Sequence, residues 1–186
     1  MAEKKTCFII TPIGEEGSET RQHIDDVIDE IVIPAFQDKY EIIPPHRIKK
    51  IGNITEDVLE YLRSSDLVVA NLTGLNPNVM YELGYRHCVE KPVIVIALDG
   101  TKLPFDVKDG RTFFYKNSIA GARRLREDLV EVEGNIDFDK PQKSRINSEN
   151  TLVHDTKTTG ASLERAGNYC VVCRVFLEPN LRYTQK

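Results

Sequence analysis

The chain of 186 residues contains no tryptophan, only two methionines, and no apolar run long enough to cross a lipid bilayer. A membrane-spanning helix needs about 20 mainly apolar residues, so the sequence excludes an integral membrane protein. A signal peptide needs a long apolar stretch and a small-residue cleavage site, whereas the first residues are charged and lead into a short run broken by Pro12 and Gly14. We therefore expect a cytoplasmic protein.

A basic excess is also missing, because 25 lysines and arginines face 29 acidic residues, for a net charge of −4. Surfaces that bind nucleic acids are usually basic, so we expect no direct nucleic-acid binding. The four cysteines are too widely spaced for a dense disulfide framework. Cys170 and Cys173 form a single C-x-x-C without the second pair that a zinc site needs. We therefore expect no metal site.

Short apolar runs alternate with segments of helical periodicity over about 130 residues. Continuous apolar runs are typical of strands that are buried on both faces of a parallel sheet. The alternation predicts an α/β fold: a doubly wound, mainly parallel five-stranded sheet, flavodoxin-like or Rossmann-like, with helices on both faces. The expected strands are Cys7–Ile10, Tyr40–Ile43, Asp66–Leu72, Pro92–Leu98 and Thr112–Tyr115.

Helix starts are marked by side chains that cap the first turn. In the first of these helices, Pro34 predicts an end or a kink. In the third, Pro77 suits the first helical position. The four expected helices begin near Ser18, Thr55, Asn76 and Ser118.

The composition changes after residue 133. Residues 134–160 are polar and show little periodicity, as in a linker, and only Asn168–Leu177 regains a strand-like pattern. We predict one α/β domain over residues 1–133 and, over residues 134–186, a linker and C-terminal tail with a possible edge strand.

The most informative segment is the turn that follows the third strand, because ligands of open α/β sheets bind beyond the carboxyl ends of the strands. Asn76 is the expected N-cap, and the amides that follow it are expected to be free to bind an anion such as phosphate. Glu82 falls in the second turn of that helix. Its carboxylate is a candidate nucleophile or general base, and the alternative is an ordinary acid on a surface helix.

The stretch Asp66–Pro92, DLVVANLTGLNPNVMYELGYRHCVEKP, resembles the nucleoside 2-deoxyribosyltransferase superfamily, including its nucleotide N-hydrolase branch. In these families a buried strand leads through a short loop to a Y-E-L-G helix, whose glutamate is the nucleophile. The resemblance covers roughly residues 6–115 and implies that Glu82, within Tyr81–Gly84, has this role. TIR domains share the flavodoxin-like layout and place a catalytic glutamate comparably.

The chemistry that the resemblance implies is cleavage of the bond between an anomeric carbon and a base nitrogen, through an oxocarbenium-like transition state. The leaving base requires a second acid. Relatives carry an aspartate at the start of the helix before the strand, and Asp57 is the nearest match. Its spacing to Asp66 is one residue longer than expected, so Glu56 competes with it, and either side chain is also explained as an ordinary first-turn acid.

The resemblance also suggests residues that bind the substrate. In the nucleotide-hydrolase branch, a serine and a glycine before the glutamate receive the 5′-phosphate, and Asn76 and Asn78 stand in their places. Arg21 matches phosphate geometry or is a solvated helix residue, and His46 lines the pocket or caps its loop. The full set of candidate substrate-binding residues is Thr11, Gly14, Ser18, Arg21, His46, Asn71, Asn76 and Asn78.

The expected function is therefore cleavage or transfer of the N-glycosidic bond of a nucleoside, a nucleotide or NAD, which TIR-like relatives cleave. Such domains often serve in bacterial antiviral or signalling systems. The reaction requires no metal or organic cofactor, and we expect a homo-oligomer, because relatives commonly build sites between subunits. The alternatives are a nucleotide sensor that does not cleave its ligand, which Asn71 and Asn78 favour, and a TIR-like signalling or defence interaction module.

Overall fold

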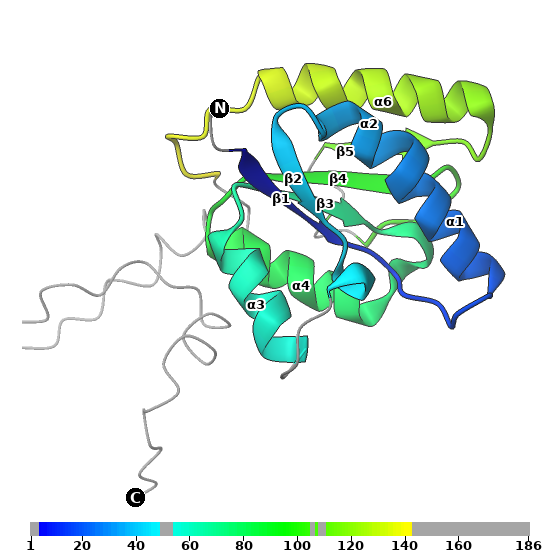
Figure 1. Cartoon of the computed structure of the whole chain (residues 1–186), viewed down its shortest axis with the longest axis horizontal. Coiled ribbons are helices and arrows are strands. Elements are labelled where there is room, and N and C mark those ends of the chain that lie inside the picture. The colour runs from blue at the N-terminus through cyan, green and yellow to red at the C-terminus, as the bar shows by residue number, and fades with distance from the viewer. Residues whose placement is uncertain (1–3, 49–53, 105–106, 108–110, 143–186) are drawn as a thin grey trace, which may run out of the picture.

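The computed structural model describes residues 4–48, 54–104, 107 and 111–142. Within them a five-stranded sheet has the order β2-β1-β3-β4-β5, and every neighbouring pair is parallel (Figure 1). This is the flavodoxin-like order, whose switch point lies between β1 and β3. The predicted fold class is confirmed. The strands are β1 (Lys5–Ile10), β2 (Tyr40–Ile43), β3 (Leu67–Asn71), β4 (Val93–Leu98) and β5 (Thr112–Tyr115).

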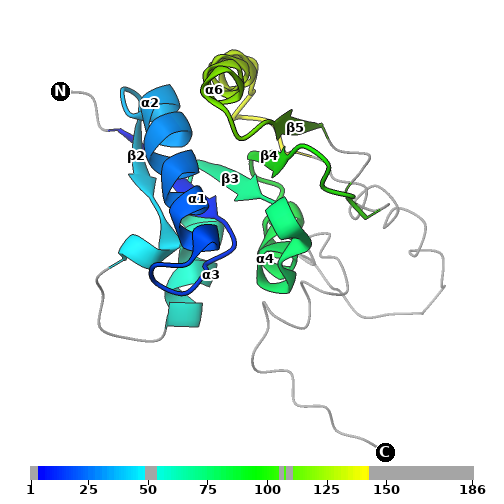
Figure 2. The same cartoon turned by 90° about the vertical axis from the view of Figure 1, so that its right-hand side faces the viewer.

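Helices cover both faces of the sheet, which explains why the central strands carry unbroken apolar runs. Two cores result, one on each face. Figure 2 shows α3 (Ile54–Ser64) and α4 (Pro77–Cys88) together on one side of the sheet, and two short 3₁₀ turns, η2 (Pro45–Arg47) and η3 (Thr73–Leu75), follow β2 and β3. The other face is covered by α1 (Glu19–Val27), the π-helical turn η1 (Ile28–Val32), α2 (Ile33–Phe36) and α6 (Ile119–Gly134).

Pro34 does not end the first helix, and the π-helical turn explains how the chain passes it. Proline has no N–H to donate to the carbonyl of residue i−4, here Glu30. Before it, Ile33 N–H bonds the carbonyl of Ile28, five residues back. The Glu30 carbonyl accepts a hydrogen bond from the guanidinium of Arg126 on α6 instead. A side chain of another helix therefore supplies the donor that proline lacks.

The chain packs back onto the domain after α6. Ile136 and Phe138 contact the core between the sheet and α6. The backbone N–H of Gln142 donates to the Glu90 carbonyl at 2.8 Å. The boundary at residue 133 stays a prediction, and the expected edge strand Asn168–Leu177 lies outside the described residues. No helix within the described part is long and apolar enough to cross a membrane.

A completely buried arginine fixes α4 against the start of β3. Arg86 has no exposed surface and donates to the carbonyls of Leu62, Ser65, Asp66 and Pro92 at 2.7 to 3.2 Å. Burial lowers its pKa to about 10, so the guanidinium stays charged at neutral pH. These carbonyls include orphans at the end of α3. The bonds set the position of α4, and with it the residues one turn earlier.

Candidate active site

Glu82 lies near the carboxyl edge of the sheet. Because α4 follows a parallel strand, its N-terminus starts at that edge, and Glu82 is about 8 Å along the helix axis from Pro77. It flanks the buried stripe formed by Val79, Leu83 and Arg86, and it is itself partly buried. This position places a carboxyl group between the core and the crevice in which such sheets bind ligands.

Burial raises the pKa of the Glu82 carboxyl to about 7, because the ionised form loses hydration. No cation within the described residues offsets this effect. At neutral pH the side chain therefore exists in both protonation states. The ionised form is poorly hydrated, which is the condition that makes a carboxylate a competent nucleophile or base.

The prediction of free amides for an anion on the first turn of α4 is wrong, because the side chain of the N-cap residue bonds them. Asn76 is the N-cap, as expected, and its Oδ1 accepts from the backbone N–H of Asn78 at 2.9 Å and of Val79 at 3.5 Å. Pro77 has no N–H, and Met80 N–H already bonds the Asn76 carbonyl. The amide nitrogen of Asn76 and the exposed side chain of Asn78 remain as donors for a ligand.

The two candidates for the second acid lie on the neighbouring helix. α3 packs against α4, and both helices lie on the same side of the sheet (Figure 2). As crossover helices they also begin at the same edge, because each follows a connection from the carboxyl end of a strand. Asp57 is partly buried in the early part of α3, whereas Glu56 is exposed. Burial favours Asp57, and the choice stays a prediction.

Two buried polar side chains mark the switch point of the sheet. Ile10 lies opposite Ala70, so the next residues, Thr11 and Asn71, are neighbours at the ends of β1 and β3. They are 4% and 1% exposed, and neither Thr11 Oγ1 nor Asn71 Nδ2 has a hydrogen-bond partner of good geometry among the described residues. Such groups are rare in native proteins because they cost about 1–3 kcal/mol each. Contact of Thr11 and Asn71 with a substrate stays a prediction.

The two side chains face away from α3 and α4. Val69, two residues before Asn71, belongs to the core beneath α1 and α6, and alternate residues of a strand share a face. Asn71 Oδ1 accepts from the backbone N–H of Thr73 at 3.1 Å, which fixes the start of the loop to α4. The residues predicted for the site therefore lie at one edge of the sheet but on opposite faces, with Thr11 and Asn71 on the α1 side and Glu82 on the α4 side.

Arg21 and His46 belong to an ion-pair network on the α1 side. Arg21 Nε lies 3.1 Å from one oxygen of Asp25, and His46 Nε2 lies 2.9 Å from the other. Arg47 pairs with both Asp25 and Asp29. Burial alone raises the pKa of Asp25, but hydrogen bonds from Arg47, Arg21 and His46 outweigh it, so the pKa is lowered. The network ties η2 to α1.

The His46 ring is only 4% exposed, and its Nε2 pairs with Asp25. Burial, followed by the charge of Arg21, lowers its pKa, so the ring is neutral near pH 7. Its Nδ1 has no hydrogen-bond partner among the described residues. The geometry favours a structural role for His46, which links the η2 turn to α1. Contact of Arg21 or His46 with a substrate stays a prediction.

Gly14 and Ser18 shape the first loop. A side chain at Gly14 would bring a Cβ to 2.6 Å from Ser18 Oγ and 2.9 Å from Thr20 Cβ, so only glycine fits. Ser18 caps α1 by accepting from the Arg21 N–H at 3.2 Å, as its position in the sequence predicts. Both residues have structural tasks that do not depend on a ligand.

A series of hydrogen-bonded side chains that the sequence patterns did not predict lies at the same edge of the sheet. The Tyr115 hydroxyl, at the end of β5, is 2.9 Å from His23 Nε2 and 3.3 Å from Thr73 Oγ1, which accepts from Leu98 N–H at 2.9 Å. Burial is the main cause of the raised pKa of Tyr115. These residues are up to 92 positions apart, so no local pattern reveals the contact.

No group of three or more His, Cys, Asp or Glu side chains within the described residues is arranged to hold a metal ion. Cys170 and Cys173 lie outside those residues.

No protein-family model and no curated protein matches the sequence. Among solved structures, the chain is similar to the 2-deoxyribosyltransferase of Bacillus psychrosaccharolyticus, with 15% identity, a TM-score of 0.50, and coverage of 75% of this chain and 98% of that one. The likeness establishes a shared fold. That fold is the one implied by the resemblance of the stretch Asp66–Pro92.

Two further solved structures are similar at a lower level. They are a 2-deoxyribosyltransferase of Leishmania mexicana, with 17% identity, a TM-score of 0.42, and coverage of 63% of this chain and 76% of that one, and a CMP N-glycosidase of Clostridium botulinum, with 15% identity, a TM-score of 0.44, and coverage of 69% and 99%.

Proposed function

We propose that this protein is an enzyme that cleaves or transfers the N-glycosidic bond of a nucleoside or nucleotide, with Glu82 as its nucleophile. The observation that carries the proposal is the state of Glu82. It is the glutamate of the Tyr81–Gly84 motif, it lies near the ligand-binding edge of a fold shared with a 2-deoxyribosyltransferase, and burial raises its pKa to about 7 without a compensating cation among the described residues.

In the proposed reaction, an oxygen of ionised Glu82 attacks the anomeric carbon of the sugar. The bond from that carbon to the base nitrogen breaks, and the electron pair leaves with the base. The positive charge that develops on the sugar ring is offset by the carboxylate, and a glycosyl ester forms on Glu82. Water, or a second base in the case of transfer, then attacks the same carbon. The ester bond to Glu82 breaks, its electron pair returns to the carboxylate, and the proton lost by the attacking group passes to the residue that protonated the leaving base.

The departing base takes up a proton, and Asp57 is the proposed donor because it is partly buried on the helix beside α4. At the switch point, Thr11 Oγ1 and Asn71 Nδ2 are buried and have no hydrogen-bond partner of good geometry among the described residues, which suits a sugar hydroxyl or a base edge. The amide groups of Asn76 and Asn78 supply further donors. NAD contains the same type of linkage and belongs among the substrates to test.

The test is release of free base from a panel of deoxynucleosides, deoxynucleotides, ribonucleotides and NAD, followed by chromatography. Wild type, Glu82→Gln, Asp57→Asn and Glu56→Gln are compared, the last as the matched acid on the same helix. We expect Glu82→Gln to abolish release while ligand-induced thermal stabilisation persists, and Asp57→Asn to slow release more than Glu56→Gln does. Release that is unchanged in Glu82→Gln contradicts the proposal.

A second candidate is a nucleotide-binding module that does not cleave its ligand. The amide side chains at Asn71 and Asn78, which can bind a nucleotide but cannot act as acids, favour it. Its signature is thermal stabilisation by a member of the panel that is equal in wild type and Glu82→Gln, with no base released by either.

A further inference from the structure

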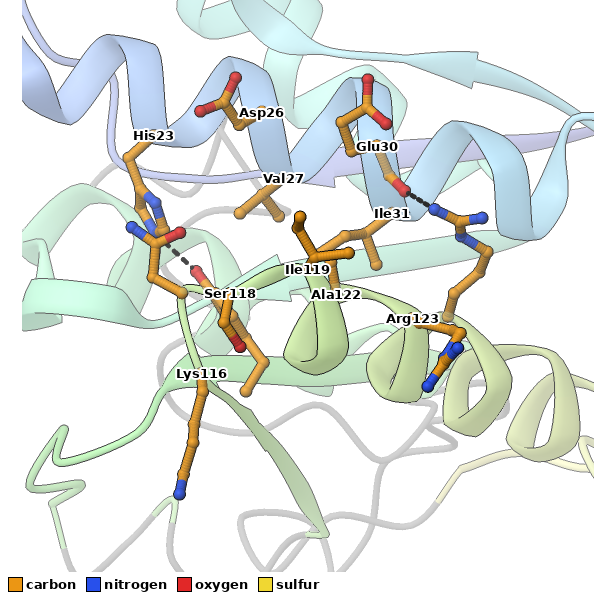
Figure 3. Close-up of a pocket in the computed structure, with 13 residues that line it drawn as sticks. His23, Asp26, Val27, Glu30, Ile31, Lys116, Ser118, Ile119, Ala122 and Arg123 are labelled. Carbon is orange, nitrogen blue, oxygen red and sulfur yellow. Dashed lines mark hydrogen bonds between the residues drawn. The ribbon is translucent and has the colours of Figure 1, made fainter.

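A groove on the face opposite α4 is not used by the proposed reaction. It has a volume of about 520 Å³ and runs between α1 with η1 on one side and the first turns of α6 on the other (Figure 3). Its apolar part is formed by Val27, Ile31, Ile119 and Ala122. One end is closed by the pair His23 and Tyr115, whose polar atoms satisfy each other at 2.9 Å.

The two walls of the groove carry opposite charges. Asp26 and Glu30 line it from the side of α1 and η1, and Lys116 and Arg123 line it from the side of α6. All four residues are exposed. None of them takes part in a salt bridge within the part of the chain that the structure describes. The charges therefore remain available to a partner.

Ile119 is the most unusual residue of the groove. It projects from the start of α6 toward α1 (Figure 3) and is 93% exposed, far more than the other exposed large apolar residues, of which Ile13 at 53% is the next. A large aliphatic side chain in water beside an apolar groove lacks the stabilisation that burial would give it. Such an arrangement is typical of an interaction surface.

We propose that this groove is the interface of a symmetric homodimer, in which Ile119 of each copy inserts into the groove of the other. A two-fold axis that runs along the groove places the acidic wall of one copy over the basic wall of its partner. An axis across the groove would place like walls together, which repel. The charge pattern therefore selects both the partner, a second copy of the chain, and the direction of the axis.

The positions of the charges also predict which residues of the two copies form ion pairs in the dimer. Arg126 bonds the Glu30 carbonyl within one chain, which shows that α1 with η1 and α6 run side by side in this register. Arg123 lies toward that end of the groove (Figure 3). Under a two-fold axis along the groove, Arg123 of one copy meets Glu30 of the other, twice per dimer. This proposal is independent of the reaction proposed for Glu82.

The test is the mass of the full chain in solution, measured by sedimentation over a hundredfold range of concentration. We expect a dimer for wild type, and a monomer for Ile119→Glu, which places two charges in the contact and raises the dissociation constant by about 100-fold or more. Phe114→Glu is the matched control, because Phe114 is also a large exposed apolar residue, 48% exposed, on a strand face that points away from α6. It stays dimeric.

A charge exchange tests the axis. Arg123→Glu weakens the dimer by about tenfold, and Glu30→Arg in the same chain restores it, while each single variant keeps the far-UV circular dichroism of wild type. Three results overturn the proposal: a monomeric wild type over the whole range, a dimer that persists in Ile119→Glu, or a double variant that is no tighter than the single one.

Discussion

The charged residues on the two faces of the sheet differ in how far they are paired with opposite charges. On the α1 side, Arg21, His46 and Arg47 surround Asp25 at 2.9 to 3.1 Å. On the α4 side, Glu82 is partly buried, and its pKa is raised by loss of hydration, with no offsetting cation among the described residues. The first arrangement lowers the free energy of the folded chain, and the second raises it when Glu82 is ionised. A destabilised carboxylate beside a well-anchored helix indicates function, whereas a saturated network indicates structure.

The largest expected effect is on turnover. If this effect is absent, the functional contrast between Glu82 and the Asp25 network is lost. Glu82→Gln removes the proposed nucleophile, so we expect base release to fall by about a thousandfold or more. We expect its unfolding free energy at pH 8 to rise by about 1 kcal/mol, because the amide carries no charge to desolvate. Steady-state kinetics and urea titration measure the two. A variant that loses activity together with stability would assign Glu82 a structural role.

The next effect concerns the anchor of α4. Arg86→Leu leaves four backbone carbonyls with fewer donors, and we expect the unfolding free energy to fall by about 3–5 kcal/mol. Arg63→Leu is the control, because Arg63 pairs with Glu60 on the surface of α3 and is 60% exposed; we expect a change below about 0.5 kcal/mol. Urea unfolding distinguishes them, and equal effects would show that Arg86 does not anchor the helix.

The pH dependence of turnover sharpens the contrast. The proposed nucleophile, Glu82, acts when it is ionised, and its pKa is raised to about 7. We expect kcat/KM to fall about tenfold per pH unit below pH 7. The sign for stability is opposite: the raised pKa makes the folded state less stable as pH rises from about 4.5 to about 7, where the change ends. Comparing pH profiles of unfolding for wild type and Glu82→Gln isolates this contribution.

The smallest expected effect is in the α1 network. The pKa of Asp25 is lowered, so its stabilisation is present above the unfolded value near 3.8 and is lost as pH falls through the lower folded value. Asp25→Asn should reduce the unfolding free energy at pH 7 by about 1 kcal/mol and leave a smaller loss at acid pH. Thermal unfolding at pH 7 and pH 3 measures both. Base release should change less than in Glu82→Gln.

Much of the fold could be predicted from local patterns. Unbroken apolar runs placed all five strands, and Ser18, Asn76 and Ser118 marked helix starts because a capping side chain acts on amides only two or three residues away. Of the two outcomes predicted at Pro34, an end or a kink, the helix end is absent, since the missing donor is offset by Arg126, which is 92 positions away in the sequence. The candidate nucleophile could be found from the Tyr81–Gly84 motif, but its environment could not.

The sequence by itself determined the strands, the helix starts and the residue types near the carboxyl edge, because these depend on periodicity and on neighbours within one turn. Only the tertiary structure decided what each polar group meets there. It gave Asp25 three cationic or hydrogen-bonding partners and gave Arg86 four carbonyls, and it gave Glu82 burial without a counter-charge among the described residues. Ionisation and reactivity depend on hydration and on contacts between distant segments, and these exist only once the chain is folded.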